Sequence, residues 1–69
     1  MKMMPVDSSN LAAVGYDKKS QTLRIRFGHG GLYEYYNVSE DEYEGLMNAP
    51  SHGRYFNFNI KGSYEWSEL

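Results

Sequence analysis

The chain has 69 residues, which is enough for one small domain and too few for two. It contains no cysteine, so a disulfide framework and a thiolate metal site are excluded. Its formal net charge of -2 gives no overall attraction for nucleic acid, and such binding needs a local basic surface. No apolar run reaches the length of a signal peptide or a membrane span, so we expect a soluble cytoplasmic protein without membrane contact.

The first part of the chain predicts a lead-in and one weak strand. Residues 1–8 are interpreted as a partly ordered lead-in, because Pro5 and the polar run after it favour turns. Residues 11–16 are a strand candidate, followed by a polar connection at 17–21. Alternation along this strand predicts two faces, one with Ala12, Val14 and Tyr16 and the other with Leu11, Ala13 and Gly15.

The next segment has the pattern of a β-hairpin. Residues 22–27 alternate apolar and basic side chains, which is typical of a half-buried strand. The run 28–31 follows, and its three glycines are predicted to supply the positive φ angles of a tight turn. Residues 32–37 then return antiparallel, which completes a three-stranded meander with residues 11–16.

Two arginines define the outer face of this hairpin. If Tyr33 and Tyr35 face the core, Glu34 falls on the outer face beside Arg24 and Arg26, and this cross-strand charge pairing supports the register. Two interpretations of the arginines stay open. They form either a solvated face partly neutralised by Glu34 or part of a basic binding surface.

A helix is predicted to begin after Val38. Ser39 is of the N-cap type, Glu42 stands three residues on as its capping-box partner, and an acidic first turn suits the positive end of the helix dipole. Gly45 weakens this helix by up to about 1 kcal/mol relative to alanine, and Pro50 ends it. The buried stripe is expected to consist of Tyr43, Leu46 and Met47.

Residues 51–60 are compatible with two structures. Phe56, Phe58 and Ile60 alternate with asparagines, which is the pattern of a strand. With Ser51 as N-cap, apolar residues at three- and four-residue spacing instead predict a short helix. We favour the helix.

Together these elements predict a single α+β domain over residues 1–69: a three-stranded antiparallel meander followed by two short helices, packed in two layers. Burial of aromatic rings is expected to build much of the core, because the chain has 7 Tyr, 3 Phe and 1 Trp. Tyr64 and Trp66 are expected to fold back over that core, and a final extended segment is one structure that would place them there. So small a sheet leaves edges through which two copies can pair.

The order of several short motifs indicates a family. The motifs are Val6-Asp7-Ser8-Ser9, Val14-Gly15-Tyr16-Asp17, Leu23-Arg24-Ile25-Arg26-Phe27, Gly31-Leu32-Tyr33-Glu34-Tyr35, Val38, and Ala49-Pro50-Ser51-His52-Gly53-Arg54-Tyr55-Phe56-Asn57 with Ile60. This succession, from about Val6 to Tyr64, resembles the KTSC domain, a family named after a C-terminal extension of some lysyl-tRNA synthetases. The chain departs from the pattern at Ser39, where proline is common, and at the added Pro50.

The resemblance implies a small stand-alone or appended domain of bacterial or phage origin. It further implies an association with nucleic acid, through the synthetase, and no established enzyme activity. Its spacing, with Phe56 and Ile60 required and Phe58 not, also favours the helix over the strand.

No arrangement of residues points to catalysis. His29 and His52 are the only imidazoles, and neither has carboxylates at ligand spacing. Ser51 and His52 cannot act as nucleophile and base, because neighbouring side chains at a helical start point in different directions. The glycine run 28–31 precedes no helix, which excludes a phosphate loop. We expect no metal, no cofactor and no enzyme activity.

The first binding hypothesis is a nucleic-acid module for RNA or single strands. Basic side chains contact phosphates in such a module, and an aromatic ring stacks a base. The residues assigned to this surface are Arg24, Arg26 and Tyr36 from the hairpin and His52, Arg54 and Lys61 from the last segment.

The alternative is a protein-interaction or accessory module without nucleic-acid affinity. Its polar corner satisfies the backbone of a partner chain through Ser51, Arg54, Tyr55 and Asn57. The same corner has a structural interpretation as well, in which Ser51 caps a helix, Gly53 allows close packing and Asn57 ties the helix to the sheet.

Overall fold

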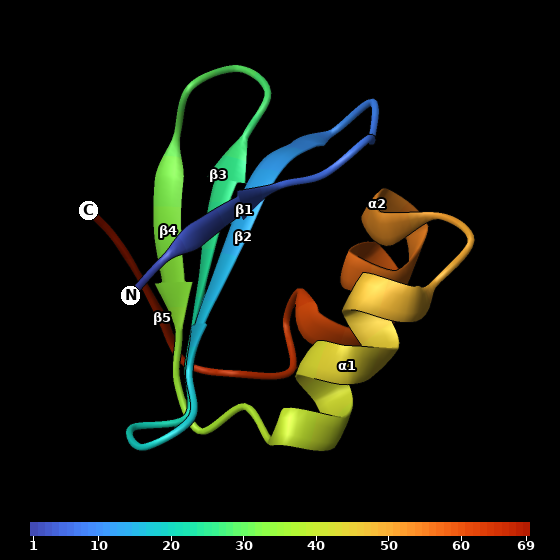
Figure 1. Cartoon of the computed structure of the whole chain (residues 1–69). Coiled ribbons are helices and arrows are strands. Elements are labelled where there is room, and N and C mark those ends of the chain that lie inside the picture. The colour runs from blue at the N-terminus through green and yellow to red at the C-terminus, as the bar shows by residue number, and fades with distance from the viewer.

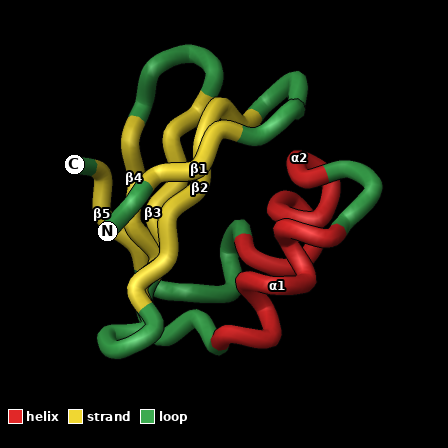
Figure 2. Tube along the Cα trace, viewed as in Figure 1, coloured by secondary structure: helices red, strands yellow, loops and turns green.

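The computed structural model describes all residues from Met1 to Leu69 and has two layers, an antiparallel sheet and a helical layer on one of its faces (Figures 1 and 2). Five strands follow one another in space in the order β1-β2-β3-β4-β5. The strands are β1 Met3–Pro5, β2 Leu11–Asp17, β3 Thr22–Phe27, β4 Leu32–Tyr35 and β5 Trp66–Glu68. The helical layer consists of α1 Glu40–Asn48, α2 His52–Tyr55 and the π-helix η1 Phe56–Ile60. The predicted α+β class is confirmed, whereas the predicted number of strands is too low.

One of the additional strands, β1, lies within the residues interpreted as a lead-in. It pairs with β2 at the edge of the sheet, so that interpretation was wrong for residues 3–5. Pro5 is tolerated there because the next residue, Val6, donates its N–H to Ala12 O at 3.1 Å. Alternation along the strand then turns the proline nitrogen away from β2, where a missing N–H costs no ladder bond.

The other additional strand, β5, lies at the opposite edge. It pairs with β4, with Trp66 opposite Tyr35 and Glu68 opposite Tyr33. The extended form considered for the end of the chain is therefore confirmed. Both edge strands have only three residues, a length that limits unwanted pairing between copies. The two termini lie on the side of the sheet away from the helices (Figure 1).

A β-bulge changes the predicted faces of β2. The register between β2 and β3 shifts between Leu11 and Ala13, which gives β2 one extra residue. Leu11 and Val14 are consequently both buried, at 1% and 0% exposure, although strict alternation placed them on opposite faces. The error arises because a bulge is set by the neighbouring strand and has no signature in the apolar pattern.

The β3–β4 hairpin has the predicted register, with Arg24 opposite Glu34 and Ile25 opposite Tyr33. Of the three glycines in its turn, only Gly30 has a positive φ, of 106°. Gly31 is needed for a different reason: an added Cβ would lie 2.8 Å from a ring atom of His29 and 2.9 Å from one of Tyr33. The turn thus holds these two rings close to its backbone.

Helix α1 begins as predicted. The Ser39 hydroxyl accepts a hydrogen bond from Glu42 N at 3.2 Å, and the chain becomes extended at Ala49, before Pro50. The capping box is not completed, because the Glu42 carboxylate turns to the Tyr64 hydroxyl, which donates to its Oε2 at 3.3 Å. The buried stripe is confirmed: Leu46 is fully buried, and Tyr43 and Met47 pack against the core.

The helical interpretation of residues 51–60 is confirmed, and the strand alternative is wrong. Ser51 caps α2 by accepting from Arg54 N at 3.2 Å. The helix then widens into η1, where Lys61 N donates to Phe56 O at 2.9 Å. Phe56 and Ile60 face the sheet. They complete a core that also contains Leu11, Val14, Leu23, Ile25, Tyr35, Val38 and Leu46.

No helix in the structure combines the length and the apolar character needed to cross a membrane.

Candidate functional site

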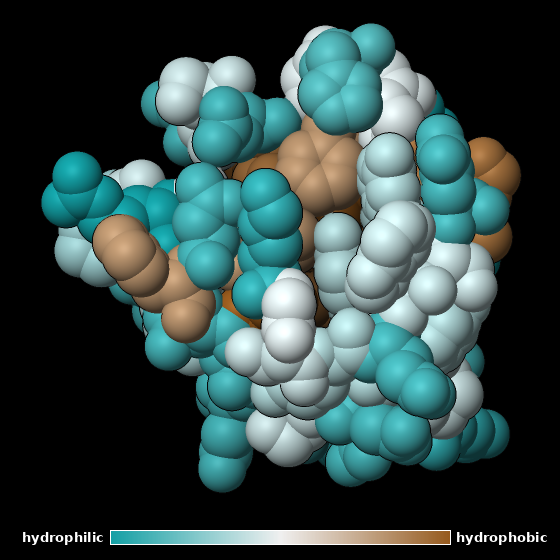
Figure 3. Space-filling view, turned by 180° about the vertical axis from the view of Figure 1, so that it is seen from behind, coloured by the Kyte–Doolittle hydropathy of each residue, from teal (hydrophilic) through white to brown (hydrophobic).

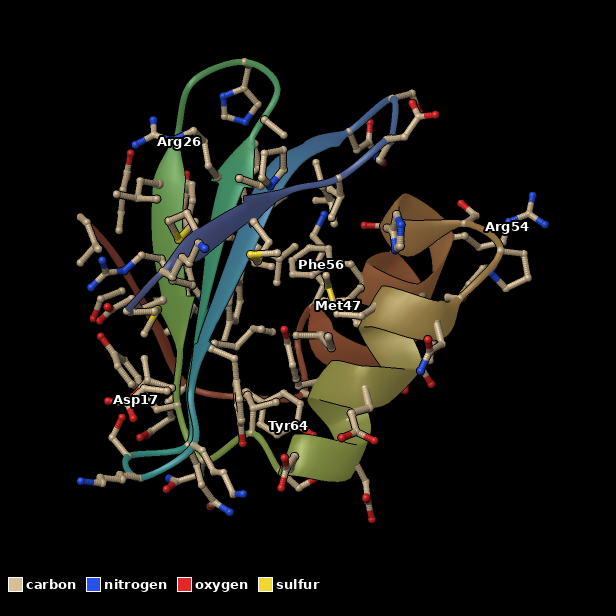
Figure 4. All side chains as sticks on the ribbon, viewed as in Figure 1. Asp17, Arg26, Met47, Arg54, Phe56 and Tyr64 are labelled. Atoms are coloured by element: carbon tan, nitrogen blue, oxygen red, sulfur yellow. The ribbon has the colours of Figure 1, made fainter.

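The structure does not bring the predicted basic residues together on one surface. Arg24 and Arg26 alternate with the buried residues of β3, so they lie on the face of the sheet away from the helices. Arg54 belongs to α2, on the helical side. Arg26 and Arg54 lie at opposite sides of the molecule in Figure 4.

On the outer face, Arg24 is already paired. Its Nε donates to Glu34 Oε2 at 2.9 Å, and the two side chains form an ion pair that is only partly exposed, at 31% and 15%. The Tyr36 hydroxyl donates to the second oxygen, Glu34 Oε1, at 3.3 Å. The neutralised interpretation of this face is therefore confirmed for Arg24, whereas Arg26 is exposed.

The predicted residues at the start of the last segment have local partners or line a shallow hollow. The Ser51 hydroxyl is used as a helix cap, and His52 Nδ1 lies 2.8 Å from Leu46 O. Ser51, Arg54 and Tyr55 line a hollow of about 340 Å³ on the outer side of η1, together with Ala49, Pro50, Phe58 and Asn59. We refer to this hollow as the Phe58 hollow.

A larger concavity contains the remaining two predicted residues, Asn57 and Lys61. It has a volume of about 620 Å³ and lies between β3–β5 and the end of η1. The rear view in Figure 3 shows a hollow with a hydrophobic floor and a more polar rim. Its lining is Asn10, Phe27, His29, Tyr33, Tyr35, Phe56, Asn57, Lys61, Gly62 and Trp66, and we refer to it as the aromatic pocket.

Aromatic rings that lock one another form the wall of this pocket. Phe27 meets both Tyr33 and Phe56 edge to face, with ring centroids 5.4 Å apart in each pair. Tyr35 meets Phe56 in the same way at 5.3 Å, and Trp66 tilts over Tyr33 at 5.6 Å. Edge-to-face contacts of this kind fix ring orientation and stabilise each pair by about 0.5–1.5 kcal/mol. The rings therefore have a fixed arrangement, in which Phe56 and Tyr35 are buried and Trp66 is exposed.

Local structure explains why polar groups stand at the rim. The π-turn of η1 keeps Phe56 pointing between the layers (Figure 4) and places Asn57 and Lys61 beside the same pocket. Single π-turns are frequent at functional sites, because the wide turn re-aims side chains. On the sheet side, the β3–β4 turn stacks His29 on Phe27, with centroids 5.6 Å apart.

The charge at the pocket is small and unpaired. The structure contains two ion pairs, Lys18–Glu40 and Arg24–Glu34, so no carboxylate lies within ion-pair distance of Lys61. Burial, with a smaller contribution from Tyr33, raises the pKa of Tyr35, and its hydroxyl remains a neutral donor at physiological pH. The pocket thus combines flat apolar faces with amides and one free cation.

Sequence reasoning found Asn57 and Lys61 and missed the other eight lining residues. Five of the eight are Phe, Tyr or Trp, and their rings were assigned to the core, as is usual for aromatics in so small a domain. A signal was present in the paired alternation of Phe27, Tyr33 and Tyr35 with a late tryptophan, but only the pairing of β4 with β5 closes these rings into a wall. No three His, Cys, Asp or Glu side chains gather into a group that could hold a metal ion.

Comparisons of sequence and of fold with known proteins lead to the same family. The sequence model of the KTSC domain matches residues 7–64, in agreement with the resemblance seen in the motifs. The fold is similar to the crystal structure of a KTSC domain protein from Yersinia pestis, with a TM-score of 0.96, 35% identity, and coverage of 99% of this chain and 96% of that one.

Similar sequences occur in proteins of very different length. A lysine–tRNA ligase of Nostoc punctiforme is 39% identical over 67 residues, which are 97% of this chain and 12% of the ligase. A protein of Tsukamurella paurometabola is 42% identical over 59 residues, which are 86% of this chain and 88% of that protein. The chain therefore spans about an eighth of the ligase and nearly the whole of the second protein.

Proposed function

The chain belongs to the KTSC domain family, and from this premise we propose that it is a non-catalytic module that binds single-stranded nucleic acid, with one base held in the aromatic pocket. The aromatic pocket is the observation that carries the proposal. Its volume of about 620 Å³ falls within the range of small-ligand sites. Trp66 is 56% exposed and packs on Tyr33, so its indole offers a flat group a face for stacking.

Polar groups at the rim suit a base with an attached phosphate. Amide side chains such as those of Asn10 and Asn57 can donate to and accept from the edge of a base. Lys61 can pair with one phosphate, since no carboxylate of this chain neutralises it. Stacking of a base on an aromatic ring contributes about 1–3 kcal/mol, so the rings supply most of the affinity.

The family relationship favours nucleic acid as the ligand class. One similar protein is a lysine–tRNA ligase, and the tRNA in that name is a nucleic acid. A stacking pocket also fits a protein with a net charge of -2, because its affinity comes from rings and only one cation. Such a role belongs in the cytoplasm, the compartment that a cysteine-free sequence favours.

An NMR amide-shift titration tests this function. Short single-stranded RNA and DNA are added at 50 mM and 200 mM salt. We expect shifts at residues 27–33, 56–62 and 66, and none on the outer face around Arg24. One phosphate contact predicts that log affinity falls with log salt at a slope of about −0.7, which is roughly a threefold loss over this range.

Two exposed cations provide a matched pair of variants. Lys61→Gln is expected to abolish the salt dependence and weaken binding several-fold, whereas Arg26→Gln on the outer face leaves both unchanged. The absence of shifts at low salt would contradict the function. A salt slope that depends on Arg26 and not on Lys61 would move the binding surface to the outer face.

A further inference from the structure

A second hollow adjoins the aromatic pocket, and η1 separates the two. Asn57 lines the aromatic pocket, and its neighbour in the chain, Phe58, lines the Phe58 hollow. Adjacent Cα atoms are about 3.8 Å apart, so a single turn of backbone divides the two concavities.

Phe58 is an aromatic side chain that the fold does not use. It is 77% exposed, while its neighbours Phe56 and Ile60 are 3% and 0% exposed. It takes part in none of the ring pairs that join the other aromatics of the chain. An aromatic ring that stays exposed keeps its apolar surface in water and adds no buried area to the core, so it does not stabilise the fold. It remains available to stack on a partner group.

A free cation stands beside this ring. Arg54 lines the same hollow and belongs to neither ion pair of the structure. Its backbone N–H is fixed by the Ser51 cap, and Asn59 is tied to the same turn by donating its side-chain N–H to Tyr55 O at 3.1 Å. The hollow therefore combines an exposed ring with a guanidinium on a backbone that is held in place.

The combination of a flat ring and a cation repeats, in a smaller form, the chemistry of the aromatic pocket. We propose that a single nucleic-acid strand crosses η1, with one base in the aromatic pocket and the adjacent base stacked on Phe58. The phosphate between these two nucleotides pairs with Lys61, and the phosphate that follows the second one pairs with Arg54. This inference rests on the proposed function. It adds a second nucleotide subsite, so the minimal ligand is an oligonucleotide of two or three residues.

Nucleic acid fits this pair of concavities better than a peptide does. The two concavities repeat the same ring-and-cation arrangement, which suits a polymer with one flat group and one negative charge per unit. Along η1, backbone groups are engaged in the helical ladder, so a peptide that crosses η1 gains no main-chain hydrogen bonds there.

The test compares a mononucleotide with a trinucleotide. Adenosine monophosphate and the adenine trinucleotide, in RNA and DNA forms, are titrated by NMR into the protein and into Phe58→Ala. Because the ring is exposed, the variant is expected to fold. We expect it to bind the mononucleotide unchanged and the trinucleotide about fivefold or more weakly. Leu69→Ala is the matched control and is expected to change neither, because Leu69 is 57% exposed and ends the chain on the side away from the helices (Figure 1).

Salt dependence gives an independent readout. Two phosphate contacts predict a slope of about −1.4 for the trinucleotide, which is roughly a sevenfold loss between 50 and 200 mM salt. Arg54→Gln is expected to return this slope to about −0.7 and to leave the mononucleotide slope unchanged. Equal responses to RNA and DNA would assign recognition to base and phosphate, and a preference for RNA would add the 2′-hydroxyl.

The outcomes separate the two proposals. Unchanged trinucleotide binding by Phe58→Ala, with normal mononucleotide binding, would overturn the second subsite and leave the proposed function standing. An equal loss for both ligands would also overturn it, because the effect would then come from the fold. No mononucleotide binding by the unmodified protein would overturn both. Shifts at Phe58 with the blocked tripeptide Glu-Phe-Glu, and none with the trinucleotide, would assign the hollow to a peptide.

Discussion

The two sides of the sheet differ in whether their polar side chains have partners within the protein. On the outer face, Arg24, Glu34 and Tyr36 satisfy one another within one ion pair and one hydrogen bond. On the helical side, Asn57 and Lys61 stand at the rim of a ring-lined pocket without a charged partner. The first arrangement is what a stable surface requires. The second leaves hydrogen-bonding capacity and charge free for a ligand, although the outer face has the more conspicuous arginines in the sequence.

The largest expected effect distinguishes the two sides of η1. Phe56 is buried and contacts two other rings, those of Phe27 and Tyr35, so Phe56→Ala is expected to destabilise the fold by about 3–5 kcal/mol, a large part of the stability of so small a domain. Phe58→Ala, two residues on, is expected to change the free energy of unfolding by less than about 0.5 kcal/mol. Urea unfolding followed by circular dichroism measures both. Similar losses in the two variants would mean that Phe58 is part of the core.

An intermediate effect is expected on the outer face. Glu34→Ala leaves a half-buried guanidinium and the Tyr36 hydroxyl without their partner, and we expect a loss of about 1–2 kcal/mol. The exposed pair Lys18–Glu40, with atoms 3.8 Å apart, is the control, because Lys18→Ala is expected to cost at most about 0.5 kcal/mol. If both variants lose the same amount in thermal or urea unfolding, the outer face has no special role in stability.

The smallest effect concerns the pocket wall at high pH. Burial raises the pKa of Tyr35 above its ordinary value of 10.0, so the folded state holds the phenolic proton more tightly than the unfolded state. The resulting contribution to stability is complete below pH 10 and is lost as the pH rises from there through the raised pKa. The free energy of unfolding is expected to fall less steeply above pH 10 in Tyr35→Phe than in the unmodified protein. Identical slopes would contradict the burial of this hydroxyl.

An exposed turn provides the opposite pH dependence. The Lys19 N–H and the Ser20 hydroxyl and N–H hold the pKa of Asp17 below its ordinary value of 3.8. Its contribution to stability is therefore present above pH 3.8 and lost as the pH falls below that value. Asp17→Asn is expected to flatten the acid limb of stability and to leave the alkaline limb, where Tyr35 acts, unchanged.

Local signals in the sequence were reliable for this chain, and signals that depend on distant partners were not. Ser39 and Ser51 were identified as helix caps because a cap depends on residues only three positions away. The Arg24–Glu34 register followed from one tight turn. By contrast, the pairing of β1 with β2 and of β4 with β5 joins segments whose own patterns are short and weak. The bulge in β2 has no local pattern at all.

In the candidate site, too, residues with a local signal were predicted and residues that depend on distant partners were not. Lys61 stood out as a basic residue of the last segment, and Asn57 as a member of its polar corner. The rings of Phe27, Tyr33 and Trp66 did not, since an aromatic residue in a core and one in a pocket wall have the same sequence pattern. Only the three-dimensional arrangement, in which β5 leaves these rings partly uncovered, separates them.

The central claim is that the aromatic pocket binds a base, and the chain offers a direct probe of it. Trp66 is the single tryptophan of the protein and lines this pocket, so its fluorescence reports on the site alone. We expect adenosine monophosphate and single-stranded oligonucleotides to quench or shift this fluorescence in a saturable way at low salt, with weaker binding in Lys61→Gln and unchanged binding in Arg26→Gln. Fluorescence that remains constant at all nucleotide concentrations would contradict the claim.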